Sequence, residues 1–396
     1  MSGLLTIDDA LAAVLARVRP LPSERVALEA AAGRVLAEEV QARVDLPPFR
    51  SSAMDGFAIR AADVPGSLPV VFRIAAGRPA ERPLHSGEAM GIATGGTVPE
   101  GADAVVPIEI VDETDNRVEI REPVEEGAHI RPVGGDVRAG EALLPAGTTL
   151  GAAQVGALAA VGVAEAVCAR RPSVAVLSTG TELRRPGEQL GPGQIYESNS
   201  TMLAAAFEAA GAVVERLDAV ADDAEAHRHA LERGLECDML VSSGGVSVGP
   251  HDLVRRVLAE LGVEEVFWGV SVKPGKPLAF GVRGRTLVFG LPGNPVSSLV
   301  AVELFVRPAL AALQGAEPGP HYERARLAAP LRRNAARDEL VRARTSREED
   351  ETVVEPLAGQ ESHMIVRAAA ADALVHVPAG EGELIAGTRV RILRLR

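Results

Sequence analysis

Asp238-Met-Leu-Val241, followed directly by Ser242-Ser-Gly-Gly-Val-Ser-Val-Gly-Pro-His-Asp252, is the stretch that decides the fold class of this chain. The short apolar run is typical of a buried strand, and the Gly-rich turn after it leads into a helical pattern. The same order recurs in Ser173-Val-Ala-Val-Leu177 with Ser178-Thr-Gly-Thr-Glu182, and in Thr286-Leu-Val-Phe289 with Gly290-Leu-Pro-Gly-Asn-Pro-Val-Ser-Ser298. Three such units predict an open, mostly parallel α/β sheet.

The three Gly-rich turns form the predicted ligand site. Ligands of such sheets bind beyond the carboxyl ends of the strands, where turn amides and helix N-termini attract anions, so each turn could hold a phosphate or a pterin edge. One turn alone is about as often structural as functional, so the prediction depends on all three. The candidate substrate-binding residues are Ser178, Thr179, Gly180, Ser243, Gly244, Gly245, Ser247, Pro292, Gly293 and Asn294.

Lys273 and Lys276 are the only lysines among the 41 basic residues, and they stand together in Lys273-Pro-Gly-Lys276-Pro. A lysine ammonium is a compact charge with three rotating donors, which suits a rounded oxyanion such as phosphate or a tetrahedral oxometallate. The alternative is a solvated turn without a role. We expect this turn to reach the same edge of the sheet and to bind an anion there.

Acidic residues at the strand ends complete the candidate site. A polyanion held by lysines and amides commonly needs a hard divalent cation as well, and Glu182, Asp222 and Asp252 fall at or just beyond strand ends. Asp222 and Asp252 could instead be helix caps. No Walker-type phosphate loop and no Ser or Cys nucleophile with a His base is recognisable, which argues against an ordinary P-loop NTPase.

Composition excludes several classes of function. A net charge of −13 and 3% aromatic residues argue against nucleic acid as a partner. The two cysteines, Cys168 and Cys237, have no spacing typical of zinc ligands or a disulfide framework. Without a signal-like start or 18 consecutive apolar residues, the chain is expected to be cytoplasmic, with no membrane partner.

The length of 396 residues predicts several domains around the α/β sheet. A helix capped by Thr6, a helical stretch from about Glu29 to Val40 and Ala-rich helical sequence from Thr149 to Val163 predict a helical N-terminal domain. Short apolar alternations broken by Gly and Pro predict an inserted β-rich domain and a C-terminal small β-barrel. The predicted domains are 1–45 plus 137–170 (helical), 46–136 (β-rich), 171–315 (α/β) and 320–396 (β-barrel).

Taken in order along the chain, these motifs resemble the molybdopterin molybdenumtransferase family, which is MoeA-like and includes the E domain of gephyrin. The resemblance extends across essentially the whole chain, although Thr181, Gly269 and Glu361 depart from the family pattern. Its carrying segments are Ser51-Ser-Ala-Met-Asp-Gly-Phe57, Ala93-Thr-Gly-Gly-Thr-Val-Pro99, Arg131-Pro-Val-Gly-Gly-Asp136, Ser178-Thr-Gly-Thr-Glu-Leu183, the turn from Ser242 to Gly249, the lysine turn and Pro292-Gly-Asn-Pro-Val-Ser297.

The resemblance implies that adenylylated molybdopterin and molybdate are converted to molybdenum cofactor and AMP, with Mg²⁺ as the cation. It also implies a homodimer of four-domain subunits whose cleft includes the second domain of the partner, and a molybdopterin adenylyltransferase that delivers the substrate. By resemblance, the catalytic residues are Asp55, Asp136, Glu182, Lys273 and Lys276, the further substrate-binding residues are Thr94, Arg131, Ser362 and Arg342 (or Arg337 in its place), and the metal ligands are Asp222 and Asp252.

Two alternative functions belong to other classes. A molybdopterin adenylyltransferase resembles residues 171–315 alone, and the modules on both sides argue against it. A non-catalytic molybdopterin carrier or scaffold would bind the pterin but release no AMP.

Overall fold

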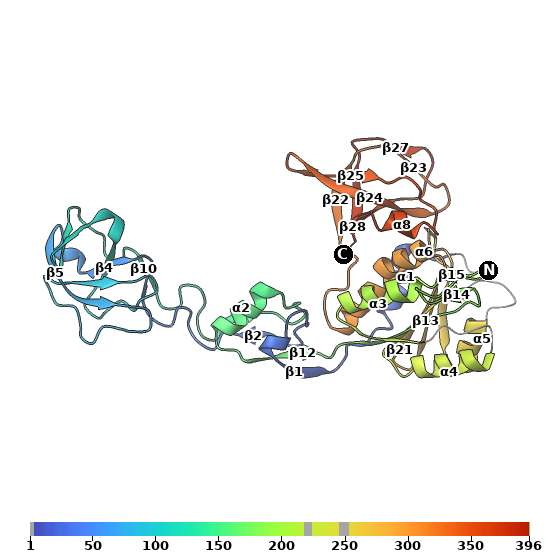
Figure 1. Cartoon of the computed structure of the whole chain (residues 1–396), viewed down its shortest axis with the longest axis horizontal. Coiled ribbons are helices and arrows are strands. Elements are labelled where there is room, and N and C mark those ends of the chain that lie inside the picture. The colour runs from blue at the N-terminus through green and yellow to red at the C-terminus, as the bar shows by residue number, and fades with distance from the viewer. Residues whose placement is uncertain (1–3, 218–223, 245–252, 396) are drawn as a thin grey trace. The chain divides into compact units, whose positions relative to one another are not determined.

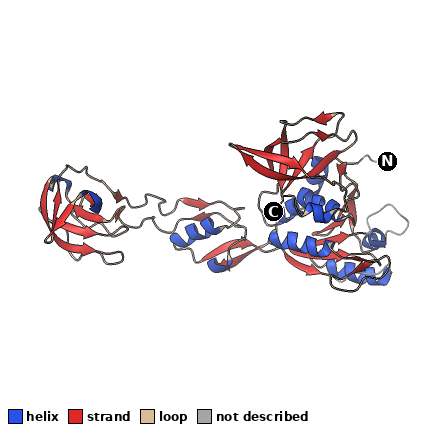
Figure 2. Ribbon diagram, turned by 45° about the horizontal axis from the view of Figure 1, so that its top comes forward, coloured by secondary structure: helices blue, strands red, loops and turns tan. Residues whose placement is uncertain are grey.

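The computed structural model describes residues 4–217, 224–244 and 253–395. The chain forms two compact units: Met1–Glu24, Gly33–Ala37 and Val167–Arg396 make up the first, and Arg25–Ala32 with Glu38–Ala166 make up the second. Figures 1 and 2 show the helices and strands of each unit. Strands β1 (Ser23–Ala27) and β12 (Glu165–Ala169) contain points where the chain passes from one unit to the other.

A six-stranded sheet with the order β16-β13-β17-β21-β20-β18 forms the centre of the first unit. Strands β16, β13, β17 and β21 pair in parallel, whereas β20 pairs antiparallel with both β21 and β18, so only β20 is reversed and the predicted open, mostly parallel sheet is confirmed. The bounds are β13 Ser173–Ser178, β16 Val213–Arg216, β17 Met239–Ser243, β18 Glu264–Trp268, β20 Ala279–Arg283 and β21 Thr286–Leu291.

Both faces of this sheet are covered, because alternate residues of a strand point to opposite sides. On β13, Val174 and Val176 pack with one core, and Ala175 and Leu177 pack with the other. Figure 1 shows α4 and α5 on one side of the sheet and α1, α3 and α6 on the opposite side. The helices are α1 Ile7–Leu15, α3 Asn199–Ala209, α4 Ala224–Gly234, α5 Leu253–Glu260, and the continuous α6 Pro295–Ala301, η4 Val302–Val306 and α7 Arg307–Leu313.

The continuous helix 295–313 is the core helix of this unit. Within the described ranges it is the one helix long and apolar enough to cross a membrane, with a mean hydropathy of 1.7, yet 78% of that stretch is buried inside the unit. Helix α1 packs against it, and the predicted Thr6 cap is present, because Thr6 Oγ1 accepts the Asp9 N–H at 3.1 Å. The N-terminal helix therefore belongs to the core of the α/β sheet.

The predicted C-terminal β-barrel is confirmed. Strands β24, β25, β22, β28 and β26 pair in that order, and the pairing of β26 with β24 closes the barrel. Strand β19 (Val272–Lys273) adds to β24 in parallel from the sheet region of the chain. The bounds are β22 Tyr322–Leu327, β23 Leu331–Arg332, β24 Asp338–Glu348, β25 Glu351–Pro356, α8 Ile365–Ala368, β26 Ala373–Val377, β27 Glu383–Leu384 and β28 Arg389–Arg394. Outside the barrel, β14 (Leu183–Arg184) and β15 (Ile195–Tyr196) pair with each other in a separate two-stranded sheet.

The second unit contains the predicted β-rich module, a six-stranded sheet with the order β7-β4-β6-β5-β9-β8. Its apolar residues form two buried clusters, around Phe57 and around Met90. The elements are β2 Val40–Gln41, β3 Ser51–Ser52, β4 Gly56–Ile59, η2 Ala61–Asp63, β5 Gly66–Ile74, β6 Ala89–Ile92, β7 Ala104–Pro107, η3 Ile108–Ile110, β8 Asp112–Thr114, β9 Arg117–Ile120, β10 Ile130–Arg131, β11 Ala142–Leu144 and α2 Ala152–Ala160.

The predicted helix from about Glu29 to Val40 is wrong. Only Leu28–Ala30 forms a short 3-10 turn (η1), and Val40 pairs with Leu144 in a strand. Gly33 has a φ of +75°, which interrupts any helix there, and the Ala37 N–H donates to the Val167 carbonyl at 2.9 Å. Long-range backbone pairing has overridden the local helix propensity. The four-domain division stays a prediction.

Candidate active site

The three Gly-rich turns lie together at the carboxyl edge of the central sheet. The Thr179 N–H donates to the Ser243 carbonyl, and the Gly244 N–H donates to the Leu291 carbonyl, both at 3.1 Å. Gly244 has a φ of +91°, and a side chain there would begin 2.8 Å from the Thr179 carbonyl oxygen. This close approach requires glycine, so the first and second turns are packed directly on each other.

Asn199, at the start of α3, joins the second turn to the third. Its Nδ2 donates to Ser243 Oγ at 2.8 Å and to the Gly293 carbonyl at 2.7 Å. Its Oδ1 is buried and has no hydrogen-bond partner among the residues that the structure describes. Sequence reasoning missed this residue, and the signal that could have found it is an Asn at the N-terminus of a helix in the same α/β unit.

The third turn leads into the first turn of α6. Pro295 occupies the first helical position, and Ser298 Oγ donates to the Pro292 carbonyl at 2.6 Å. Pro292, Gly293 and Asn294 are thereby held between the end of β21 and the beginning of the core helix. This places the N-terminus of a long helix at the predicted anion site.

The lysine turn lies over the same helix start. Gly275 has a φ of +111°, and a side chain there would begin 3.5 Å from the Ser297 carbonyl oxygen of α6. Lys273 Nζ pairs with Glu339 Oε1 at 3.0 Å, whereas the exposed Lys276 ammonium has no ion-pair partner within the described ranges. Sequence reasoning did not identify Glu339, because this contact joins β19 to β24 of the barrel.

A loop that follows the barrel strand β25 brings Ser362 to this helix start. The Ser362 carbonyl accepts the Val296 N–H at 3.1 Å. The loop is held by Arg342, whose side chain is 1% exposed and whose guanidinium donates to four acceptors. These are Gln360 Oε1 at 3.3 Å, the Gly359 carbonyl at 2.8 Å, the Glu361 carbonyl at 3.2 Å and the Met364 carbonyl at 3.0 Å.

This environment bears on the predicted oxyanion role of Arg342. Burial lowers the pKa of Arg342, and the negative charge of Glu361 acts in the opposite direction. The hydrogen bonds of its guanidinium are directed at the loop, while Arg337, its alternative, is only half-buried at the approach to β24. The assignment of either arginine to the oxyanion stays a prediction.

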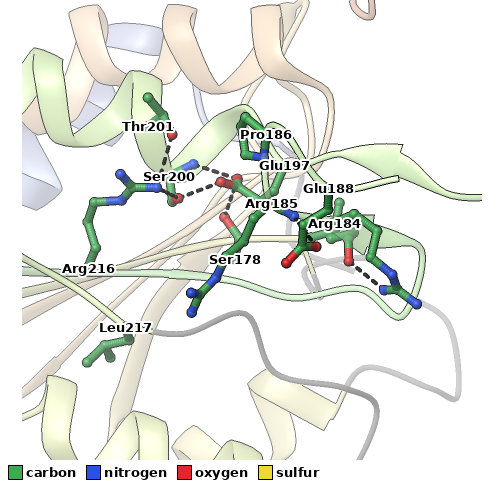
Figure 3. A pocket seen from close by; sticks show the side chains of 11 residues that line it. Ser178, Arg184, Arg185, Pro186, Glu188, Glu197, Ser200, Thr201, Arg216 and Leu217 are labelled. Carbon is green, nitrogen blue, oxygen red and sulfur yellow. Dashed lines mark hydrogen bonds between the residues drawn. The ribbon is translucent and has the colours of Figure 1, made fainter. Parts of the chain in front are cut away.

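A pocket of about 580 Å³ lies next to the first turn and is lined by Ser178, Arg184, Arg216 and neighbouring polar residues. Figure 3 shows the buried Glu197 at its wall. The Glu197 carboxylate accepts hydrogen bonds from Ser178 Oγ at 2.8 Å, the Ser200 N–H at 2.7 Å and Ser200 Oγ at 2.5 Å. Ser178, a predicted substrate contact, therefore has its hydroxyl proton directed at Glu197.

Two further predicted residues, Gly180 and Glu182, lie next to each other at the first turn. The carboxylate of Glu182 folds back over Gly180, where a side chain would begin 2.7 Å from both Glu182 oxygens. Gly245, Ser247, Asp222 and Asp252 lie outside the described residues. Among the residues that are described, no group of three His, Cys, Asp or Glu side chains is arranged to hold a metal ion.

Four predicted residues belong to the second unit. Asp55 Oδ1 accepts the Thr94 N–H at 2.7 Å, so these two are brought together. Arg131 lies on β10, paired with Ser51 of β3, and the Asp136 N–H donates to the Leu46 carbonyl at 2.9 Å. Asp55 therefore shapes the turn that carries Thr94.

Comparisons with known proteins match three consecutive regions of this chain. The matching family descriptions are "MoeA N-terminal region (domain I and II)" for residues 5–162, "Probable molybdopterin binding domain" for 175–312 and "MoeA C-terminal region (domain IV)" for 324–395. The chain is 38% identical to a molybdopterin molybdenumtransferase 2 of Mycobacterium tuberculosis, over 93% of this chain and 94% of that protein.

Two other proteins of the same kind are similar to this chain over most of their length. A molybdopterin molybdenumtransferase of Haemophilus influenzae is 37% identical over 81% of each chain. A crystal structure of the molybdopterin biosynthesis MoeA protein from Pyrococcus horikoshii superimposes with a TM-score of 0.84 at 29% identity, covering 99% of this chain and 100% of that one.

Proposed function

The chain belongs to the MoeA family of molybdopterin molybdenumtransferases, and on that premise we propose that it inserts molybdenum into adenylylated molybdopterin, with release of AMP. All three family regions occur in order, which favours this reaction over the adenylyltransferase alternative. The observation that carries the proposal is the convergence of the Gly-rich turns, the lysine turn and the Ser362 loop on the start of α6.

The proposed mechanism is electrostatic positioning. The helix N-terminus and the turns at the sheet edge attract the phosphates of the adenylylated pterin. Lys276 and Lys273 hold molybdate next to the dithiolene sulfurs, so that the two reactants meet in a fixed geometry. Two molybdenum–sulfur bonds form at the dithiolene as one molybdate oxygen leaves as water with the two thiol protons. A second water molecule attacks the phosphoanhydride bond, which breaks with AMP as the leaving group.

Mg²⁺ is a separate part of the proposal. Its predicted ligands, Asp222 and Asp252, lie outside the described residues, so its support is the family resemblance and the charge of the polyanion that it would neutralise. When bound, the cation would neutralise phosphate charge and assist the departure of AMP.

The remaining expectations extend the same proposal. In a homodimer, Asp55, Thr94, Arg131 and Asp136 would line the cleft of the other subunit. A molybdopterin adenylyltransferase would deliver the substrate in the cytoplasm, and neither nucleic acid nor a membrane would be a partner. The net charge of −13 supports the exclusion of nucleic acid.

AMP release from purified protein tests the proposal. The protein is given adenylylated molybdopterin and Mg²⁺, with and without molybdate, as wild type, as Lys276→Ala and as the control Arg283→Ala. Arg283 is an exposed cation at the opposite end of β20, which begins just after the lysine turn. We expect molybdate-dependent AMP release that collapses only in Lys276→Ala; pterin binding without AMP release would favour a carrier.

A further inference from the structure

We infer that Glu339 is a positioning residue for Lys273, so that the two lysines have different tasks. Lys273 is fixed by a carboxylate and orients the oxyanion, whereas Lys276 supplies the uncompensated positive charge that attracts it. This inference rests on the proposed function, because it assumes that the lysine turn meets an oxyanion.

The backbone places Glu339 opposite Lys273. Strand β19 pairs in parallel with the beginning of β24, with Val272 opposite Asp338 and Lys273 opposite Glu339. The ion pair between Lys273 and Glu339 measures 3.0 Å, and the two side chains are 47% and 12% exposed, respectively. Glu339 is therefore a nearly buried partner that approaches the ammonium from the barrel, and Lys273 keeps donors for a ligand on its exposed side.

A partly buried network fixes the strand that carries Glu339. Asp338 Oδ2 contacts His376 Nε2 at 2.8 Å, and His376 Nδ1 contacts Arg391 Nη2 at 2.8 Å. Because arginine can only donate, His376 Nδ1 is the acceptor, and the proton on Nε2 is donated to Asp338. Asp338 Oδ1 also accepts the Ala379 N–H at 2.8 Å. The beginning of β24 is thus tied to β26 and β28, and this fixes the backbone from which the Glu339 side chain extends.

The two lysines differ in charge compensation, and this difference indicates different tasks. Glu339 cancels the formal charge of Lys273, whereas Lys276 has no ion-pair partner within the described ranges. An oxyanion is therefore attracted mainly by Lys276, and the fixed ammonium of Lys273 sets its orientation. A misplacement of about 1 Å in such a contact can cost on the order of 100-fold in rate, so loss of Glu339 should lower kcat more than it raises KM.

A double-mutant cycle tests the inference through AMP release. Its members are wild type, Glu339→Gln, Lys273→Met and the double variant, with Glu323→Gln as the matched control. Glu323 also pairs with a cation at 3.0 Å on the barrel, Arg394, and takes no part in the lysine turn. We expect Glu339→Gln to lower kcat about 10- to 100-fold and to change the molybdate KM less than about threefold. Once Lys273 is Met, Glu339→Gln should have no further effect.

The two lysines also allow a test without turnover. In protein labelled with ¹⁵N only at lysine side chains, the two ammonium groups give two NMR signals. In substrate-free protein, Glu339→Gln should move the Lys273 signal and leave the Lys276 signal in place, and Lys273→Met identifies which signal is which. Added molybdate should shift the Lys276 signal of the wild type.

The outcomes separate the two ideas. Multiplicative losses in the double variant, or a Lys273 signal that ignores Glu339→Gln, would overturn the positioning role. A wild type that releases no AMP with molybdate would overturn the proposed function, and the NMR comparison would still decide whether Glu339 holds Lys273. Should Glu339→Gln fail to fold, Glu339→Asp keeps the charge and is expected to give an intermediate kcat.

Discussion

Replacing Arg342 with methionine distinguishes a residue that builds the Ser362 loop from one that contacts the oxyanion. Methionine keeps the apolar stem but removes every donor of the guanidinium. The hydrogen bonds lost run to Gln360 and to the carbonyls of Gly359, Glu361 and Met364, at 2.8–3.3 Å. We expect the loop to open and Ser362 to leave the start of α6.

The expected magnitude follows from these contacts. A hydrogen bond to a charged group contributes roughly 1.5–3 kcal/mol, and a buried carbonyl left without a partner costs about 1–3 kcal/mol. Two effects reduce the sum: the opened carbonyls reach water, and the burial that lowers the pKa of Arg342 is relieved. We therefore estimate a net loss of about 3–4 kcal/mol for the closed loop, which corresponds to roughly a 10²–10³-fold change in its opening equilibrium.

Hydrogen exchange measures this opening directly. The Val296 N–H donates to the Ser362 carbonyl, and the Met364 N–H donates to the Glu361 carbonyl, so both amides report on loop closure. Their protection should fall in Arg342→Met by up to the estimated factor, while β13 amides in the sheet keep theirs. AMP release should fall in parallel. Arg337→Met is the matched control and should leave protection unchanged.

The reasoning would be refuted by Arg342→Met protein with unchanged protection at Val296 and Met364. If that protein also had a raised molybdate KM, Arg342 would be a direct contact of the oxyanion rather than the anchor of the loop. A raised KM in Arg337→Met with normal protection would assign the oxyanion contact to Arg337.

Three further predictions concern other parts of the structure. Gly275→Ala forces a side chain into a φ of +111° next to Ser297, which costs roughly 1–2 kcal/mol and should raise the molybdate KM, measured by AMP release. Asn199→Ala removes the hydrogen bonds to Ser243 and Gly293, so AMP binding measured by calorimetry should weaken while the melting temperature changes little. Burial raises the pKa of Tyr322 to about 12. The stabilising contribution of the neutral Tyr322 hydroxyl is therefore complete below about pH 10 and is lost as the pH rises toward 12. Tyr322→Phe should make alkaline unfolding, followed by circular dichroism, less steep in that range.

The elements that were predicted correctly from the sequence are those determined by short, contiguous segments of the chain. Buried strands such as β13 and β17 are near-continuous apolar runs, and the Gly-rich turns directly after them follow from the same short segments. The helix expected between Glu29 and Val40 failed for the opposite reason. Its alanines have high helix propensity, but Ala37 donates its N–H to Val167, far along the chain.

The candidate site divides in the same way. Its glycines, lysines and Ser362 are recognisable from motifs, whereas the partners that fix them are not. The contact between Lys273 and Glu339 depends on the parallel pairing of two distant strands, and the loop-holding contacts of Arg342 depend on burial within the barrel. Neither contact leaves a pattern in the local sequence, so the residues that hold the site in place could be identified only from the folded structure.

The packing of α1 has a consequence for how the chain is made. Its buried residues Ile7, Ala10 and Val14 share a core with the helix that ends at Leu313, and the Leu21 N–H donates to the Leu313 carbonyl at 2.8 Å. On the ribosome, about 300 further residues must be synthesised after α1 before that partner exists. At roughly 5–20 residues per second this takes on the order of 15–60 s. During this interval the apolar face of α1 is without its native cover, so it is exposed to non-native contacts until the core can close.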